Sequence, residues 1–318
     1  MEAVDLMNTM NVAALDLGTN SNRLLIVDKN GNPLYRDVRH VALGDGLNEC
    51  GHFSEIAMER AICSFMDFSE MMQAYEVTSY RAIATAACRM SSNTGAFLCE
   101  VEKNSGVKVE VISEYEEARL TLKGAQLNAP KDKKYLFVYD LGGGSTEVTL
   151  ALNKEHPEII ETVSIPWGAR NATEAFSLRD YNEDGAKKLE NEVLKYMTAF
   201  MAKIKGVDYV GKTALIATSS TPLRLAAWIK NLPKYDKFAA DGAKVRIAAL
   251  ENLINKILLL DFEGRAKSVY IGKNRAEIFV AALIIFRTIY RELAVPRLVA
   301  SLKGAQEAIV SELCSTAI

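Results

Sequence analysis

The sequence predicts two α/β domains that face each other across a cleft. Its 318 residues are enough for about two domains, each able to bury its own core. Short apolar runs alternate with amphipathic segments along most of the chain, which is the pattern of an α/β protein. Two hairpin patterns of the same design, one near the start and one in the middle, indicate two related halves. We expect the first domain at residues 1–126 and the second at 127–318, with the last helix able to pack back on the first.

The first hairpin pattern lies close to the N-terminus. An apolar run at residues 12–15 predicts a buried strand, and a second run at 24–27 predicts its partner. Asp16 stands near the end of the first run, where its carboxylate could point into a crevice. Gly18 follows, and the turn is completed by the polar residues Thr19, Asn20 and Ser21. An aspartate before a glycine is also a common turn former, so this pattern alone leaves a plain structural turn open.

Strand and helix patterns alternate between the two hairpins. Ser54 is the expected N-cap of an amphipathic helix at residues 54–74. The remaining expectations are strands at 80–85 and 107–112 and helices at 94–103 and 114–123. A polar segment with a proline, at residues 128–134, is the best candidate for the linker between the domains.

The second hairpin pattern has the same order of residue types as the first. A β-branched and aromatic run at residues 135–139 predicts a buried strand that ends at Asp140. Gly142, Gly143 and Gly144 follow, and glycine lets the backbone approach a ligand closely because it has no Cβ. The hydroxyls of Ser145 and Thr146 and the carboxylate of Glu147 complete the turn. Such a turn suits a metal-bound phosphate, although a glycine-rich surface hairpin would read the same way.

The second half continues the alternation. A strand is expected at 159–165 and a long helix at 182–205. The expected elements that follow are a strand at 214–217, helices at 222–230, 244–260 and 275–293, a strand at 296–300 and a helix at 305–314.

Three carboxylates and several cations could carry phosphate chemistry. Asp16, Asp140 and Glu147 are hard oxygen donors suited to Mg²⁺, with Mn²⁺ as an alternative. The segment Ser113–Arg119 begins a helix after a strand and holds three glutamates. The helix dipole alone explains acidic residues there, yet one of them could face the cleft and orient water. Each of three arginines follows a predicted strand and could contact phosphate through its planar fork: Arg23, Arg89 and Arg119.

A hydroxyl-rich turn at residues 217–221 is a further candidate. It connects a predicted strand to a predicted helix, so it could bind a third phosphate at the N-terminus of that helix. The same residues also serve as ordinary N-caps, and the sequence does not separate the two readings.

Composition excludes several other classes. The formal net charge is −2, so no overall field attracts nucleic acid or a membrane, and neither is expected as a partner. The five cysteines and three histidines lack metal-type spacing, which argues against a zinc site. The N-terminal residues lack a signal peptide pattern, and the apolar stretch at 278–286 is too short to span a bilayer. We therefore expect a cytoplasmic protein with reduced thiols.

The motifs together resemble the exopolyphosphatase/guanosine pentaphosphate phosphohydrolase family, within the actin-like ATPase and sugar-kinase superfold. The resemblance spans nearly the whole chain. It rests on the blocks at residues 14–23, 43–47, 84–89, 111–119, 140–147, 164–169 and 274–277. It implies two actin-like (ribonuclease H-like) domains of mixed sheets with flanking helices and a cleft between them. The chain ends where the two-domain core of the family ends, so the extra C-terminal domains of longer members are expected to be missing.

The resemblance implies Mg²⁺-dependent hydrolysis of a terminal phosphoanhydride in inorganic polyphosphate or in the nucleotide pppGpp, and with it a place in the stringent response. By position, Glu117 matches the family's catalytic glutamate and Arg89 a phosphate clamp. Asp140 and Glu147 match the metal-associated carboxylates, and Asp16 is their counterpart in the first hairpin. The matching phosphate cradles are Gly18 to Ser21, with Arg23, and Gly142 to Thr146. Homodimers are common in the family.

Two other readings and two departures accompany this expectation. A polyphosphate- or (p)ppGpp-binding regulatory protein with weak turnover is the main alternative, and a kinase of the same superfold is a third. The turn at 217–221 has Ala217 and Ser220 where the family usually has glycines. The segment 301–308 lacks the family's aspartate, arginine and final glycine. A side chain in place of a glycine narrows a binding site where the backbone approaches the ligand closely. We therefore expect these departures to affect the length of substrate that is accepted and its affinity.

Overall fold

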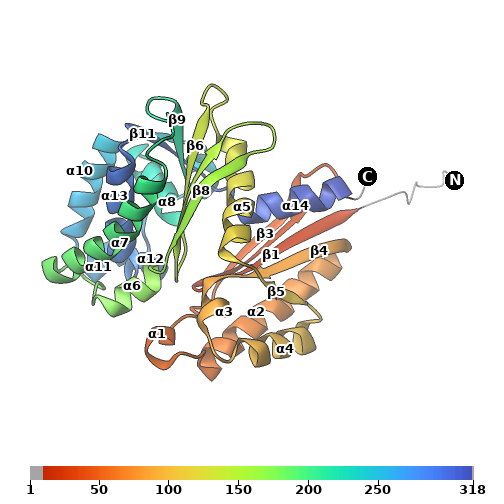
Figure 1. The fold of residues 1–318 in the computed structure, drawn as a ribbon. Helices are drawn as coiled ribbons and strands as arrows, with labels where there is room; N and C mark the ends of the chain where they lie inside the picture. The colour runs from red at the N-terminus through yellow and green to blue at the C-terminus, as the bar shows by residue number, and fades with distance from the viewer. Residues whose placement is uncertain (1–9, 317–318) are drawn as a thin grey trace.

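The structure, a computed structural model, describes residues 10–316 and contains two mixed β-sheets flanked by helices (Figure 1). The N-terminal residues on which the expectation of no signal peptide rests lie outside the described part. No helix within residues 10–316 combines the length and apolar character needed to cross a membrane.

The first sheet is built around the early hairpin. Its strands are β1 (Asn11–Leu17), β2 (Ser21–Val27), β3 (Pro33–His40), β4 (Val77–Ala84) and β5 (Val109–Val111). They lie in the order β3-β2-β1-β4-β5. Strand β1 is antiparallel to β2 and parallel to β4, so it is covered on both edges. Its side chains are buried on both faces, which explains the continuous apolar run at residues 12–15.

The second sheet repeats this arrangement and adds one strand. Its strands are β6 (Tyr135–Leu141), β7 (Thr146–Leu152), β8 (Glu158–Ile165), β9 (Thr213–Ala217), β10 (Lys244–Arg246) and β11 (Arg297–Ala300). The order β8-β7-β6-β9-β11 matches the first sheet strand for strand, and β10 extends the far edge. Asp16 pairs with Arg23 across the first hairpin, and Asp140 pairs with Glu147 across the second. The two hairpins therefore place their aspartates at equivalent positions.

Helices cover both faces of each sheet. Helix α2 (Glu55–Ala74) begins at the expected N-cap, where the Ser54 side chain accepts a hydrogen bond from the Ala57 N–H. Helix α5 (Glu114–Ala125) is capped in the same way by Ser113. The other helices of eight residues or more are α4 (Thr94–Ser105), α7 (Glu183–Lys203), α8 (Ser220–Ile229), α10 (Ile247–Leu258), α13 (Phe279–Leu293) and α14 (Ala305–Thr316).

Two long predicted helices begin later in the chain than expected. Residues 244–260 begin as strand β10, because residues 244–246 pair with β11 before α10 starts at Ile247. Residues 275–293 begin in the short helix α12 (Lys273–Ala276), and α13 starts only at Phe279. In both cases the helical pattern was right, but tertiary contacts set the first residues differently.

Helices α5 and α14 lie side by side where the two sheets meet. In Figure 1 the yellow helix α5 stands between the sheets, and the blue helix α14 lies beside it over the first sheet. The apolar side of α14 packs with strands β1, β2 and β4 in one core cluster, through Ala308, Ile309 and Val310. Helix α5 also contacts the second sheet, so it connects the two cores physically.

Candidate active site

The turns of the two hairpins line one cavity of about 330 Å³. We call residues 18–20 the first turn and residues 142–145 the second turn. Most of the residues predicted for the site line this cavity: Asp16, Gly18, Thr19, Asn20, Ser21, Arg23, Glu117, Asp140, Gly142, Gly143, Gly144 and Ser145. Three predicted residues, Arg89, Thr146 and Glu147, lie behind the cavity wall.

The two turns touch each other at the base of the cavity. A Cβ atom added to Gly143 would lie 3.0 Å from the Thr19 Cβ and 3.1 Å from the Asn20 Cβ. A Cβ on Gly144 would lie 2.9 Å from the Thr19 Oγ1. The glycines therefore let the second turn meet the first turn, in addition to any approach to a ligand.

The aspartates of the two hairpins have different partners. The Asp16 carboxylate accepts a hydrogen bond of 2.6 Å from Arg23. The Asp140 carboxylate accepts one of 2.7 Å from the Thr218 hydroxyl and one of 3.4 Å from Thr121. Burial raises the pKa of Asp140, and the nearby Asp16 charge raises it further. A cation between the two carboxylates would offset both effects.

The donor set at the cavity fits a cation that keeps other ligands. Within residues 10–316, no three His, Cys, Asp or Glu side chains are arranged to hold a metal ion by themselves. Mg²⁺ commonly takes one or two carboxylates and completes its shell with water and phosphate oxygens. Asp16 and Asp140 are the two predicted metal carboxylates that face the cavity.

Glu117 lies in the first turn of α5 and faces the cavity. Its Oε2 accepts a hydrogen bond of 2.9 Å from Arg89. Burial raises the pKa of Glu117 to about 7, against the opposing effect of Arg89 and with the charges of Asp140 and Asp16 adding to it. A carboxylate with a pKa close to neutrality is well matched to proton transfer.

Arg89 is placed differently from the sequence-based expectation of a phosphate clamp. Its Nη1 donates to Glu117 and to the Ile112 carbonyl, at 2.9 and 3.1 Å, and only 19% of its side chain is exposed. In this position the guanidinium orients Glu117 from behind. The sequence could not show this, because Arg89 and Glu117 lie on different helices.

Two other predicted residues also have internal partners. The Thr146 hydroxyl donates to the Trp167 carbonyl at 2.7 Å, and the residue is fully buried, so it does not reach a ligand in the cavity. The Glu147 carboxylate accepts from the hydroxyls of Ser145 and Ser164, at 2.7 and 3.1 Å. Burial raises its pKa well above the usual range, and the charge of Glu117 raises it further. Glu147 is thus a buried neighbour of the site and not part of its lining.

The cavity has a cationic wall that sequence reasoning missed. Arg36, Arg224, Lys237 and Arg275 line it together with the predicted Arg23. Within residues 10–316, the Arg275 side chain has no ion-pair or hydrogen-bond partner, although its backbone N–H donates to the Gly272 carbonyl. Burial and the neighbouring guanidinium groups of Arg224 and Arg23 lower the pKa of Arg275 to about 9. A set of cations that repel one another in a cavity is a site for an anion.

Arg224 is held in place on this wall. Its Nη1 donates to the carbonyls of Tyr270 and Ile271, at 2.6 and 2.8 Å, and its guanidinium lies 3.9 Å from the centre of the Tyr235 ring. Arg275 belongs to a block that carries the family resemblance, but nothing in the sequence distinguished Arg224 from other arginines.

Comparison with known proteins decides the family. The model of the Ppx/GppA phosphatase family matches residues 25–316. The chain belongs to the Ppx/GppA phosphatase family. It is 28% identical to the protein named exopolyphosphatase 2 of Mycobacterium tuberculosis, over 89% of this chain and 90% of that protein.

Solved structures of the family share the fold. The crystal structure of an exopolyphosphatase from Cytophaga hutchinsonii aligns with a TM-score of 0.87 and 23% identity, over 96% of this chain and 98% of that one. The Ppx/GppA family member of Aquifex aeolicus aligns with a TM-score of 0.75 and 25% identity, over 96% and 98%. The predicted fold class, two actin-like α/β domains of mixed sheets with flanking helices, is therefore confirmed.

The turn at 217–221, where the chain departs from the Ppx/GppA pattern, carries backbone strain. Ser219 has φ +80° and ψ 175°, a conformation that essentially only glycine adopts without cost. Its hydroxyl is buried and has no hydrogen-bond partner within residues 10–316. Thr218 next to it holds Asp140. The turn therefore supports the aspartate directly, and the strained residue lines the same cavity.

We expect Ser219→Gly to stabilise the protein by about 1 kcal/mol, because it removes a strained conformation of the folded state. The entropy that glycine adds to the unfolded chain offsets part of this gain. Chemical denaturation of both proteins measures the difference. Ser220→Gly, in the first turn of α8, is the matched control and should be neutral or destabilising. A Ser219→Gly protein less stable than its parent would contradict the strain.

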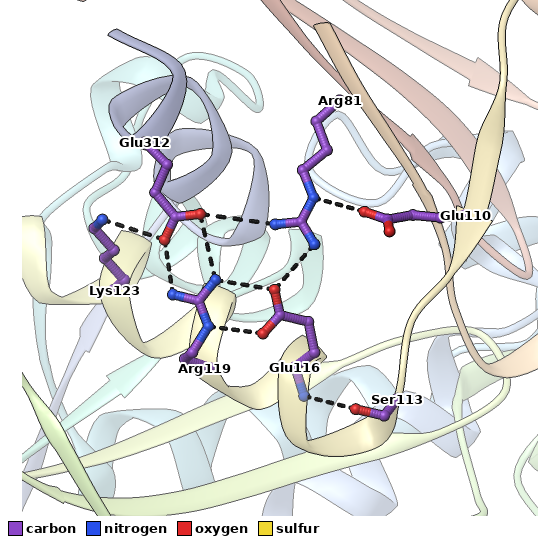
Figure 2. A network of polar contacts seen from close by, with 7 residues as sticks. All are labelled: Arg81, Glu110, Ser113, Glu116, Arg119, Lys123 and Glu312. Carbon is purple, nitrogen blue, oxygen red and sulfur yellow. Dashed lines mark hydrogen bonds and ion pairs between the residues drawn. The ribbon is translucent and has the colours of Figure 1, made fainter. Parts of the chain in front are cut away.

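Helix α5 is tied to its surroundings by an ion-pair network, shown in Figure 2. Arg119 donates to Glu116 and to Glu312 on α14, both at 2.7 Å. Arg81 on β4 reaches Glu116 at 3.0 Å, and Lys123 reaches Glu312 at 3.2 Å. Arg119, a candidate phosphate contact by sequence, thus belongs to this network and not to the cavity. The network holds the helix that carries Glu117.

The segment 301–308 also lines the cavity, and its family departures have defined contacts. Gln306, at the position of the family's arginine, donates to the Ala14 carbonyl of β1 at 3.0 Å. Glu307 accepts from the Gly304 N–H at 2.8 Å and pairs with Arg36 of the cationic wall. Both contacts anchor this segment to the first sheet, because Ala14 lies in β1 and Arg36 lies in β3.

Proposed function

We propose that the protein hydrolyses the terminal phosphoanhydride of inorganic polyphosphate, with pppGpp as a second substrate and with Mg²⁺ bound. The observation that carries the proposal is the position of Glu117. It is a buried carboxylate with a raised pKa, and it lines the same cavity as the cationic wall. The membership of the chain in a phosphatase family supports the reaction type, and the name of its mycobacterial relative supports polyphosphate as the substrate.

The side chains divide the work as follows. The cationic wall binds the chain of phosphates, and the N–H groups of the two turns surround its end. Asp16 and Asp140 would hold Mg²⁺, which supplies neutralisation of charge on the phosphate oxygens. Glu117, oriented by Arg89, positions a water molecule and accepts its proton as the water oxygen attacks the terminal phosphorus. The bond from that phosphorus to the bridging oxygen breaks, so that inorganic phosphate and the polyphosphate shortened by one unit are released. Such a transition state is loose, so positioning and charge neutralisation matter more than a strong base.

A phosphate-release assay tests this function. We expect release from long-chain polyphosphate in the presence of Mg²⁺, loss of release with EDTA and recovery with added Mg²⁺ or Mn²⁺. Polyphosphate, pppGpp and ATP should be compared at equal concentration of terminal phosphate. No release from either polyphosphate or pppGpp under any of these metal conditions would contradict the proposal.

A binding protein with weak turnover is the second candidate. The departures at 217–221 and 301–308 favour it, because both segments line the cavity and carry side chains different from those of the family. Calorimetry would then measure tight binding of polyphosphate or ppGpp, with no product after long incubation.

A further inference from the structure

Asn20 has a role that differs from the one its sequence position suggests. It was expected to contact phosphate, but both ends of its amide are occupied by protein groups. Its Oδ1 accepts two hydrogen bonds from Arg170, from Nε at 3.1 Å and from Nη2 at 2.9 Å. Its Nδ2 lies 3.2 Å from the Nδ1 of His40. The side chain is therefore a bridge between structural elements.

Arg170 holds the first turn and the second turn at the same time. It lies at the N-terminal end of helix α6 (Ala169–Ala175), whose first residues are hydrogen-bonded to the second turn. Its backbone N–H donates to the Gly143 carbonyl at 2.9 Å, while its guanidinium reaches across to Asn20. The neighbouring residues make further hydrogen bonds to the second turn. The Ala169 N–H donates to the Gly142 carbonyl, and the Asn171 side chain donates to the Gly144 carbonyl.

The Arg170 guanidinium is buried, and its charge partner Asp45 belongs to the first half of the chain. Arg170 is only 9% exposed. Its Nη1 lies 3.3 Å from Asp45, which follows the first hairpin in the chain, and 3.8 Å from Glu174 on its own helix. A buried arginine whose donors are all directed at protein acceptors is built for a fixed geometry.

We propose that Arg170 is a positioning residue that locks the two turns together through Asn20. This inference rests on the proposed function only where it predicts turnover. The two turns directly follow β1 and β6, which carry Asp16 and Asp140, so the lock sets the spacing between these carboxylates. Without it, Gly143 and Asn20 would remain in contact only through van der Waals packing.

Turnover of Arg170→Gln and Asn20→Ala tests the proposal. Misplacement of a reacting group by about 1 Å can cost about a hundredfold in rate, so we expect kcat to fall by about ten- to a hundredfold in each variant. KM for polyphosphate should change by less than about threefold, because neither side chain binds substrate. The double variant should be no slower than the slower single variant, since both changes break the same contact.

Two further variants keep the test decisive. Arg170→Lys keeps the positive charge but cannot direct two donors at one oxygen, so its loss of kcat should be intermediate. Arg291→Gln removes an exposed arginine that pairs with Glu251 far from the cavity, and it should leave kcat unchanged. Multiplicative losses in the Arg170→Gln/Asn20→Ala protein, or a rise in KM at constant kcat, would overturn the proposal in favour of direct substrate binding by Arg170.

A second measurement does not depend on activity. Amide hydrogen exchange at residues 18–20 and 142–145 should become faster in Arg170→Gln and remain unchanged in Arg291→Gln. If the parent protein released no phosphate, the proposed function would fail while this exchange result still decided the role of Arg170. Unchanged exchange in both turns of Arg170→Gln would refute the lock.

Discussion

Glu117→Gln is expected to lower the rate of phosphate release by about a hundred- to ten-thousandfold while the protein remains folded. The substitution keeps the shape of the side chain and an oxygen that accepts the hydrogen bond from Arg89. It removes the negative charge and the ability to accept a proton from water. Initial rates of phosphate release from polyphosphate measure the effect, and Glu100→Gln, on the exposed surface of α4, is the matched control.

The pH dependence provides an independent check on the same residue. Glu117 has a pKa of about 7 in the folded protein, so activity of the parent should fall as the pH drops through 7 and the carboxylate becomes protonated. The stability effect has the opposite sign. The pKa of Glu117 is higher in the folded protein than the value near 4.5 in the unfolded chain. Its contribution to the free energy of unfolding is therefore fully present below pH 4.5 and is lost as the pH rises through about 7.

Glu117→Gln should therefore be more stable than the parent at pH 8, because glutamine cannot ionise in the buried position. Thermal unfolding at pH 8 and pH 6 would show the gain shrinking at the lower pH. An unchanged rate of phosphate release in Glu117→Gln would remove this residue from the reaction, whatever the stability result.

Gly124→Ala is expected to destabilise the protein by about 3 kcal/mol and to reduce turnover with it. Gly124 on α5 lies against Gly304 in the segment that leads into α14. An added Cβ would fall 1.8 Å from the Gly304 carbonyl oxygen and 2.5 Å from its carbon. Both are backbone atoms, so the clash cannot be relieved by a side-chain rotation. Either α5 or the segment 301–304 must move.

The loss of turnover follows from the place of Gly124 on the helix that carries Glu117, about two turns further along. Urea unfolding measures the stability and the phosphate-release assay measures the rate. Gly95→Ala is the control, because Gly95 is also helical and a Cβ there would meet nothing within 4 Å. That variant should keep its rate and gain up to about 1 kcal/mol of stability. Equal stability of Gly124→Ala and its parent would show that α5 and residue 304 are not held this closely.

The hairpins were predictable because their signals are local. An apolar run, an aspartate and a turn of glycines or hydroxyls are all readable within about ten residues, and the repetition of this pattern indicated two halves. The N-cap at Ser54 and the helix that carries Glu117 follow from the same local rules. The placement of Asp16 and Asp140 in one cavity agrees with this reasoning.

The roles of the arginines could not be read in this way. Arg89 and Arg119 both follow predicted strands, yet one lies behind Glu117 and the other joins the network with Glu312. The phase of each helix and the partner it meets decide the outcome, and both depend on distant parts of the chain. Arg224 and Arg170 carried no local signal, because their partners are separated from them by 46 and 150 residues.

The position of helix α14 has a consequence for the order of assembly during synthesis. Ala308, Ile309 and Val310 fill the face of a sheet whose strands are among the earliest translated. Leu120 of α5 packs in the same cluster, but the part that α14 covers stays open until residues 305–316 have left the ribosome, so the core of the first sheet is completed only after the second sheet has been made. Nascent chains stalled before this point should expose an apolar surface that chaperones recognise, and release of the final helix should bury it.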